Sequence, residues 1–459
     1  MSANRSLDDR VLSIRDLNIS FDTASGTVHA IRGVRMDLFR GETIAVVGES
    51  GSGKSVTVKT IMGILANNGH IDSGSINYTF INEKGEKETV DMTKLSQKEI
   101  RYRFCGKHIA MVFQDPMTSL DPTMTVGKQI MEGMILHLNL SRSEAKKRAI
   151  DLLARVGIEN PEKRFNEYPH QLSGGMRQRV VIAIALACEP DILICDEPTT
   201  ALDVTIQAKI LELIKEIQAE SHFAVIYITH DLGVVAKVAD YVDVMYAGRI
   251  IEKGDIDEIF YDPRHPYTWG LLASMPDTDT DSTRLFAIPG TPPNLLEKIT
   301  GDAFAPRNPF AMKIDYMAEP PMFDVGGKHR VASWLCDPRA PKVEMPDQLK
   351  DRMEKMRKEG ILECTSIRQK NLCFMSKALS STSAPAPAMS PRRWTGSASI
   401  SGQARPMVLS ASPVRANRRP AGRSSASMIR PPERSSLTAM TSAERWRRRM
   451  RNTCGPTCR

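Results

Sequence analysis

The segment GESGSGKS, residues 48–55, constrains the fold more than any other part of the sequence. It matches the pattern GxxxxGK[ST], whose glycines let backbone N–H groups approach phosphate oxygens at the start of a helix. An apolar run, Thr43 to Val47, precedes it as expected of a buried strand, and Ser55 to Leu65 follows with a helical pattern. A chance glycine- and serine-rich loop would lack these neighbours. The segment therefore predicts an ATP or GTP site in which Lys54 holds the β- and γ-phosphates.

A second apolar strand, ILIC at residues 192–195, ends in two acidic residues. This position predicts Asp196 near a magnesium ion and Glu197 where it can polarise a water molecule. Alone, the pair could also be a solvated strand end. Another buried-type strand, Phe223 to Thr229, follows a helical stretch from Thr205 to Glu220. Together these segments predict an α/β fold with parallel strands.

Alternating and helical patterns account for much of the remaining N-terminal part. The segments that start at Val11 and run from His29 to Leu38 alternate in hydrophobicity, which predicts two edge strands. Val126 to Val156 has helical periodicity, with Ser141 and Glu144 at the spacing of a capping box. We expect a helical insertion in the α/β core.

The charge of the chain is unevenly distributed. A formal net charge of +8 would fit nucleic-acid or membrane binding, but Ser366 to Arg459 holds 18 basic and 2 acidic residues, which leaves 44 basic and 52 acidic residues before it. The longest apolar run, Val180 to Cys188, is shorter than the roughly 20 residues that cross a bilayer. The 8 cysteines form no dense framework. We expect a cytosolic protein that binds no nucleic acid and for which any membrane role depends on partners.

The segment LSGGMRQR, residues 172–179, distinguishes between families of nucleotide-binding proteins. It resembles the signature of ATP-binding-cassette (ABC) ATPases, which kinases and GTPases lack. Gln114 after the strand AMVF, Asp203 in the segment ALD, and His230 after Thr229 match further ABC elements in the same order. The resemblance implies a RecA-like P-loop core with a helical subdomain and an antiparallel β-subdomain.

The resemblance also implies roles for individual residues. Glu197 is the general base, and His230 contacts the γ-phosphate of ATP. Gln114 senses magnesium and contacts the membrane subunits, and Asp203 couples the two nucleotide sites. The implied magnesium ligands are Ser55, Gln114 and Asp196.

The nucleotide itself has two implied sets of contacts. Ser173, Gly174 and Gly175 of the signature bind the ATP held by an opposite subunit, so hydrolysis implies a head-to-tail dimer. Phe21 is a candidate for stacking on adenine. The remaining implied contacts are Gly48, Ser50, Gly51, Ser52, Gly53, Lys54, Ser55 and Val56.

Three further segments resemble the ATP-binding subunits of oligopeptide and dipeptide permeases. They are QDPMTSLDP at 114–122, RHPYT at 264–268 and IPGTPP at 288–293. The resemblance implies a motor for peptide uptake, peripheral on the cytoplasmic face of the membrane. Its implied partners are two transmembrane permease subunits, a paralogous ATP-binding subunit in a heterodimer, and an extracytoplasmic peptide-binding protein.

Two alternatives to a peptide importer remain open at this point. Importers of nickel and other small solutes share the same subfamily pattern, so the cargo could be such a solute. A soluble ABC ATPase of translation or DNA repair would usually have two ATPase units in frame or a long coiled-coil insertion, and neither is found in the sequence. The expected cofactors are ATP and Mg²⁺.

Many of these permease subunits carry four cysteines that suit an iron–sulfur cluster in a C-terminal accessory domain. The matching positions here are Asp302, Asn308, Asp315 and Ser333, none of which is a thiolate ligand. We therefore expect no iron–sulfur cluster and an accessory domain that serves as a contact surface. The predicted division is 10–254 for the nucleotide-binding domain with its helical subdomain at about 115–178, 255–346 for the accessory domain, 347–363 for a charged helix and 364–459 for a tail.

The tail is rich in Ser, Pro, Ala and Arg without periodicity, which predicts a disordered basic segment. If the segment from Ser410 to Arg418 is back-translated into DNA and the bases are read one position earlier, the codons allow the sequence VGESG[AS]GKS. This sequence has the pattern of a second phosphate loop. The single codons of Trp394, Met407 and Met428 also fit the shifted reading. We hypothesise that a frameshift runs translation into a neighbouring ABC gene, which would make the tail functionless.

Overall fold

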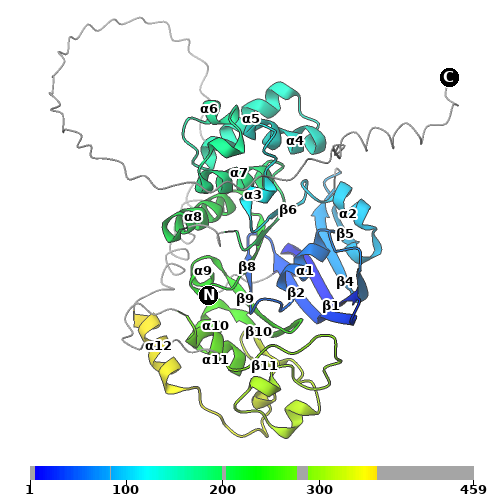
Figure 1. Cartoon of the computed structure of the whole chain (residues 1–459), viewed down its shortest axis with the longest axis vertical. Coiled ribbons are helices and arrows are strands. Elements are labelled where there is room, and N and C mark those ends of the chain that lie inside the picture. The colour runs from blue at the N-terminus through cyan, green and yellow to red at the C-terminus, as the bar shows by residue number, and fades with distance from the viewer. Residues whose placement is uncertain (1–5, 83, 199–202, 276–287, 359–459) are drawn as a thin grey trace, which may run out of the picture. The chain divides into compact units, whose positions relative to one another are not determined.

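The computed structural model describes residues 6–82, 84–198, 203–275 and 288–358, whose strands form two sheets (Figure 1). The smaller sheet is antiparallel, and its strand order is β2-β1-β4-β5. The bounds are β1 Arg10–Thr23, β2 Gly26–Phe39, β4 Gly69–Ile81 and β5 Lys87–Asp91. The prediction of two edge strands is wrong for β1, which pairs with β2 on one side and with β4 on the other.

The larger sheet carries the phosphate loop and has the order β11-β12-β10-β9-β3-β8-β7-β6. Its parallel part confirms the strands expected around the loop and around the two acidic residues. Every residue of β3, β7 and β8 is buried, as expected for strands covered on both faces. The parallel strands are β3 Thr43–Val47, β6 Ile109–Val112, β7 Ile192–Asp196, β8 Ala224–Thr229 and β9 Tyr241–Tyr246.

Helices connect the parallel strands and form the predicted insertion. α1 (Lys54–Ile61) follows the phosphate loop, and α8 (Val204–Ser221) links β7 to β8. The capping box of Ser141 and Glu144 is present at the start of α5. The helices α4 to α7 lie together (Figure 1) and share one hydrophobic cluster with β7 and β8. The remaining bounds in this part are α2 Gln97–Arg103, α3 Pro116–Ser119, α4 Val126–Leu138, α5 Arg142–Arg155, α6 Pro161–Phe165, α7 Gly174–Leu186 and α9 Leu232–Val238.

The chain beyond Gly254 continues the larger sheet. Strand β12 (His329–Val331) pairs with β10 (Arg249–Asp255), and β11 (Phe323–Gly326) pairs with β12. One hydrophobic cluster joins residues of β3 and β9 to the C-terminal region. The predicted division at Gly254 remains a prediction. The C-terminal helices are α10 Ile256–Tyr261, α11 Pro266–Ala273 and α12 Asp347–Lys358, with short 3₁₀ turns at Ala305–Arg307, Lys313–Tyr316 and Trp334–Cys336.

Candidate functional site

The phosphate loop is folded around its own lysine. The Lys54 ammonium donates hydrogen bonds to the carbonyl oxygens of Gly48 and Glu49, at 2.8 and 2.9 Å. Burial lowers the pKa of Lys54, while the negative charges of Glu197, Asp196 and Glu49 act in the opposite direction. Gly48 has a φ of +149°, and a Cβ there would overlap the Met245 carbonyl oxygen, so only glycine fits. The shape of the loop is therefore fixed by contacts within the chain.

Two of the predicted magnesium ligands are adjacent. Ser55, in the first turn of α1, donates a hydrogen bond from Oγ to Asp196 Oδ1 at 3.0 Å. Asp196 ends β7, and its burial raises the pKa of the carboxyl, against the lowering effect of the Ser55 hydrogen bond. A hydroxyl and a carboxylate are the oxygen ligands that Mg²⁺ prefers, so these two residues fit the ion.

The three predicted catalytic side chains meet at the carboxyl ends of β6, β7 and β8. Gln114 Nε2 donates a hydrogen bond to Glu197 Oε2 at 3.0 Å, and His230 Nδ1 lies 3.1 Å from Glu197 Oε1. Glu197 has a φ of +47°, a left-handed conformation that is rare outside glycine and is found at functional sites. Its N–H donates to the Ile228 carbonyl on the neighbouring strand, which fixes the turn. The arrangement presents a carboxylate that can accept a proton from water.

The signature residues form the start of a helix at which Ser173 and Gly174 are exposed and Gly175 is buried. Ser173 caps α7 and accepts a hydrogen bond from the Met176 N–H at 3.4 Å. Gly174 is exposed, and a Cβ there would meet nothing within 4 Å. A Cβ on Gly175 would lie 3.0 Å from the side chain of Ile206, next to the cap that Asp203 makes on α8. The signature and Asp203 therefore lie close together, with Ser173, Gly174 and Asp203 exposed.

Phe21 is placed differently from the loop residues. It lies near the end of β1, is partly buried and packs in the cluster beneath the antiparallel sheet. Its ring lies against Gly69 and near Leu65. The stacking of Phe21 on adenine remains a prediction, and so do the assigned roles of the other site residues.

The sequence patterns missed one pair of residues at the phosphate loop. Glu49 is a variable position in the loop pattern, yet both its carboxylate oxygens accept hydrogen bonds from Arg307, at 2.8 and 2.9 Å. The Glu49 N–H also donates to Tyr267 Oη at 2.8 Å. The only signal in the sequence was the presence of two segments outside the nucleotide pattern, HPYT at residues 265–268 and FAPR at residues 304–307.

The four positions discussed for an iron–sulfur cluster are buried and bond to the backbone instead. Oxygen atoms of Asp302, Asn308, Asp315 and Ser333 accept hydrogen bonds from N–H groups two or three residues away. Burial raises the pKa of Asp302 to about 6. Oxygen side chains used as turn caps do not fit a thiolate-bound cluster.

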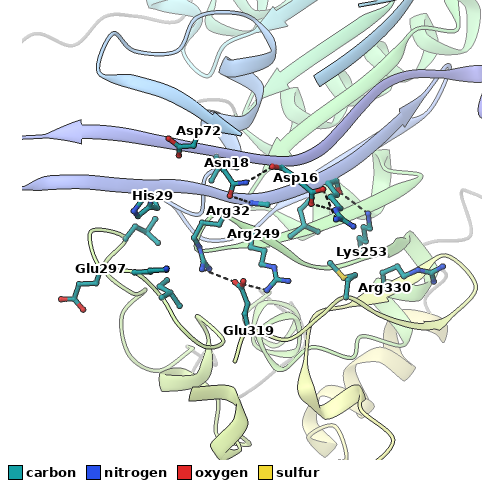
Figure 2. Close-up of a pocket in the computed structure, with 18 residues that line it drawn as sticks. Asp16, Asn18, His29, Arg32, Asp72, Arg249, Lys253, Glu297, Glu319 and Arg330 are labelled. Atoms are coloured by element: carbon teal, nitrogen blue, oxygen red, sulfur yellow. Dashed lines mark hydrogen bonds and ion pairs between the residues drawn. The ribbon is translucent and has the colours of Figure 1, made fainter. Parts of the chain in front are cut away.

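A cavity of about 920 Å³ lies elsewhere, between the antiparallel sheet and the C-terminal region. Figure 2 shows Glu319 between Arg32 and Arg249, with ion pairs of 3.2 and 3.0 Å. Arg35 on the same wall pairs with Asp16. The cavity contains neither loop nor strand-end residues of the nucleotide site, so its size does not make it the centre of the chemistry. Among the described helices, none has the length and apolar character needed to span a membrane.

Comparison with known families agrees with this geometry. The family "ABC transporter" matches residues 31–200, and the family "Oligopeptide/dipeptide transporter, C-terminal region" matches residues 251–314. The fold and the site thus define an ATP-binding-cassette ATPase.

Similar proteins define the subgroup. The chain is 58% identical to the oligopeptide transport ATP-binding protein OppD of Bacillus subtilis (strain 168), over 76% of this chain and 95% of that protein. It is 53% identical to AmiE of Streptococcus pneumoniae serotype 4, over 76% and 96%, and 53% identical to the dipeptide transport protein DppD of Lactococcus lactis subsp. cremoris, over 74% and 95%. The chain belongs to the ATP-binding subunits of oligopeptide and dipeptide ABC transporters.

Proposed function

We propose that this chain hydrolyses ATP to drive the uptake of oligopeptides or dipeptides through an ABC importer. The observation that carries the proposal is the position of Glu197, directly after Asp196 and between Gln114 and His230. The names of its similar proteins, which are oligopeptide and dipeptide transport ATP-binding proteins, support the choice of cargo.

In this proposal each group at the site has a task that its position supports. The phosphate loop and Lys54 bind the β- and γ-phosphates, and Glu197 accepts a proton from the attacking water, which His230 and Gln114 help to orient. Ser55 and Asp196, together with the predicted ligand Gln114, would hold magnesium, which would supply positive charge to offset the charge of the phosphates. The exposed signature binds the γ-phosphate of ATP on an opposite subunit, which makes a dimer necessary for turnover.

The proposed assembly couples hydrolysis to a movement of membrane subunits. Two permease subunits, a paralogous ATP-binding subunit and an extracytoplasmic peptide-binding protein complete it, with this chain on the cytoplasmic face. Closure of the two nucleotide sites would move the helical insertion, and hydrolysis would reopen them.

The test is the ATPase activity of the chain reconstituted with its permease subunits, paralogue and binding protein. We expect oligopeptides or dipeptides to stimulate phosphate release, and the preferred length identifies the cargo. Stimulation by nickel alone would support ATP-driven transport but contradict peptides as the cargo. Hydrolysis that no solute stimulates would contradict a transport function.

A further inference from the structure

Three segments outside the nucleotide motifs lie together beside the phosphate loop, two in direct contact with Glu49 and the third in contact with Arg307. Tyr267 comes from HPYT at the start of α11, Arg307 from FAPR, and Ile288 to Gly290 from IPGTPP. The first two bond directly to Glu49, and the third accepts hydrogen bonds from Arg307. Glu49 and Arg307 are 258 residues apart in the chain.

The guanidinium of Arg307 is buried, and all three of its nitrogens donate hydrogen bonds. Its side chain is only 5% exposed. Nε donates to the Pro289 carbonyl at 2.8 Å, Nη1 also reaches Tyr246 Oη at 3.2 Å, and the two terminal nitrogens bind the two Glu49 oxygens. A planar guanidinium matches a carboxylate in this bidentate geometry, which fixes orientation as well as distance. The hydrogen bonds to Glu49 raise the pKa of Arg307 above its ordinary value, so the guanidinium stays charged.

Tyr267 holds the backbone of the same residue. It is completely buried, and its Oη accepts the hydrogen bond from the Glu49 N–H. The ring packs against Tyr246 and Phe304, with centroids 4.6 and 5.4 Å away. The hydroxyl therefore has little freedom to follow a movement of the loop.

These contacts reach the nucleotide site through Lys54. The Glu49 carbonyl is one of two carbonyls that hold the Lys54 ammonium. Glu49 is thus held by the C-terminal region at its N–H and carboxylate, while its C=O holds the lysine. A shift of Glu49 would move the charge that binds the β- and γ-phosphates.

On this basis, and resting on the proposed ATPase function, we propose that Arg307 and Tyr267 are positioning residues for the phosphate loop. Through Glu49 they keep Lys54 where ATP needs it, which makes the C-terminal region part of the nucleotide-binding apparatus.

The experiment compares Arg307→Ala, Arg307→Lys, Glu49→Ala, Tyr267→Phe and the double variant Arg307→Ala/Glu49→Ala in the reconstituted complex. Arg264→Ala is the matched control, because Arg264 lies in the same region but forms an exposed pair with Asp262. KM for ATP and kcat are measured, together with the affinity of a fluorescent ATP analogue. Thermal melting shows which variants are folded.

We expect Arg307→Ala and Glu49→Ala each to raise KM about tenfold and to weaken analogue binding equally, while kcat changes less. The double variant should lose no more ATP affinity than the single variant with the larger loss, because both substitutions break the same contact. Lysine should restore only part of the affinity, and Arg264→Ala should behave as wild type.

Wild-type affinity in Arg307→Ala, or additive effects in the double variant, would overturn the proposal. If Arg307→Ala does not fold, Tyr267→Phe and Arg307→Lys decide, since unchanged nucleotide affinity in both would equally refute it. The analogue measurement needs no hydrolysis. A wild-type complex that binds the analogue without turnover would therefore count against the proposed function alone and leave this test readable.

Discussion

The two ends of the nucleotide site are held in opposite ways. At the strand ends, Glu197 contacts His230, whose side chain is 60% exposed, and Gln114, which is also exposed. At the phosphate loop, Glu49 is bound by an enclosed arginine and a buried tyrosine. Exposed contacts between polar side chains contribute little to stability and are easily replaced by contacts with water. Breaking a buried contact between charged groups is costly, because it leaves a charge without a partner. The phosphate loop is thus held by more enclosed contacts than the groups that act on water.

The strongest test of the strand-end contacts is Glu197→Gln. We expect kcat to fall by about 10² to 10⁴, the range attributed to a general base, with ATP binding retained. Phosphate release and nucleotide retention measure the two effects. Glu212→Gln, an exposed position on α8, is the control and should turn over normally. Rapid hydrolysis by Glu197→Gln would remove Glu197 as the base.

The packing of the phosphate loop can be tested with substitutions at two of its glycines. Gly48→Ala should lower the free energy of unfolding by about 3 kcal/mol or more, because the new Cβ overlaps the Met245 carbonyl and φ is +149°. Gly51→Ala, at a φ of +79° with nothing within 4 Å, should lower it by only about 1 kcal/mol. Urea unfolding measures both. Equal losses would mean that the loop is not held against β9.

A smaller effect is expected at Asp302, a buried acid of the C-terminal region. Its pKa is raised to about 6 by burial, so the folded protein binds this proton more tightly than the unfolded chain does. The folded state therefore loses stability as the pH rises from about 4 to 6 and stays less stable above that range. Asp302→Asn keeps an oxygen for the Phe304 N–H and removes the charge.

We expect Asp302→Asn to raise the free energy of unfolding by about 1 to 2 kcal/mol at pH 8, and to lose this advantage near pH 4. Urea unfolding at both pH values measures the difference. Asp262→Asn, an exposed position in the same region, should show no such pH dependence. A variant that is less stable than wild type at pH 8 would contradict the prediction.

The sequence predicted those features that local patterns encode. The phosphate loop, the strand that ends in Asp196 and the Ser141 capping box all depend on neighbours in the chain, and the structure places them as expected. Strand β4 was missed, and with it the interior position of β1. The contact between Glu49 and Arg307 has no local pattern, because its partners are brought together only by the folded C-terminal region.

Other predictions lie beyond what the structure describes. The segment Ala201–Leu202 and the tail from residue 359 are outside the described residues. The frameshift hypothesis therefore stays a prediction about the gene sequence. DNA sequence across the codons for Glu363 to Met440 would decide it. An overlapping frame without an open ABC reading would refute it.

The pairing of β12 with β10 limits how this ATPase can be shortened. A chain cut after Gly254 would keep every nucleotide motif but leave β10 without its neighbour β12, so that β10, paired with β9 alone, would become an edge strand. It would also uncover the apolar side chains that the C-terminal region shields. Unpaired strand edges and exposed apolar surface favour aggregation. For this protein, the minimal cassette defined by motifs is therefore smaller than the minimal piece that can be handled in solution.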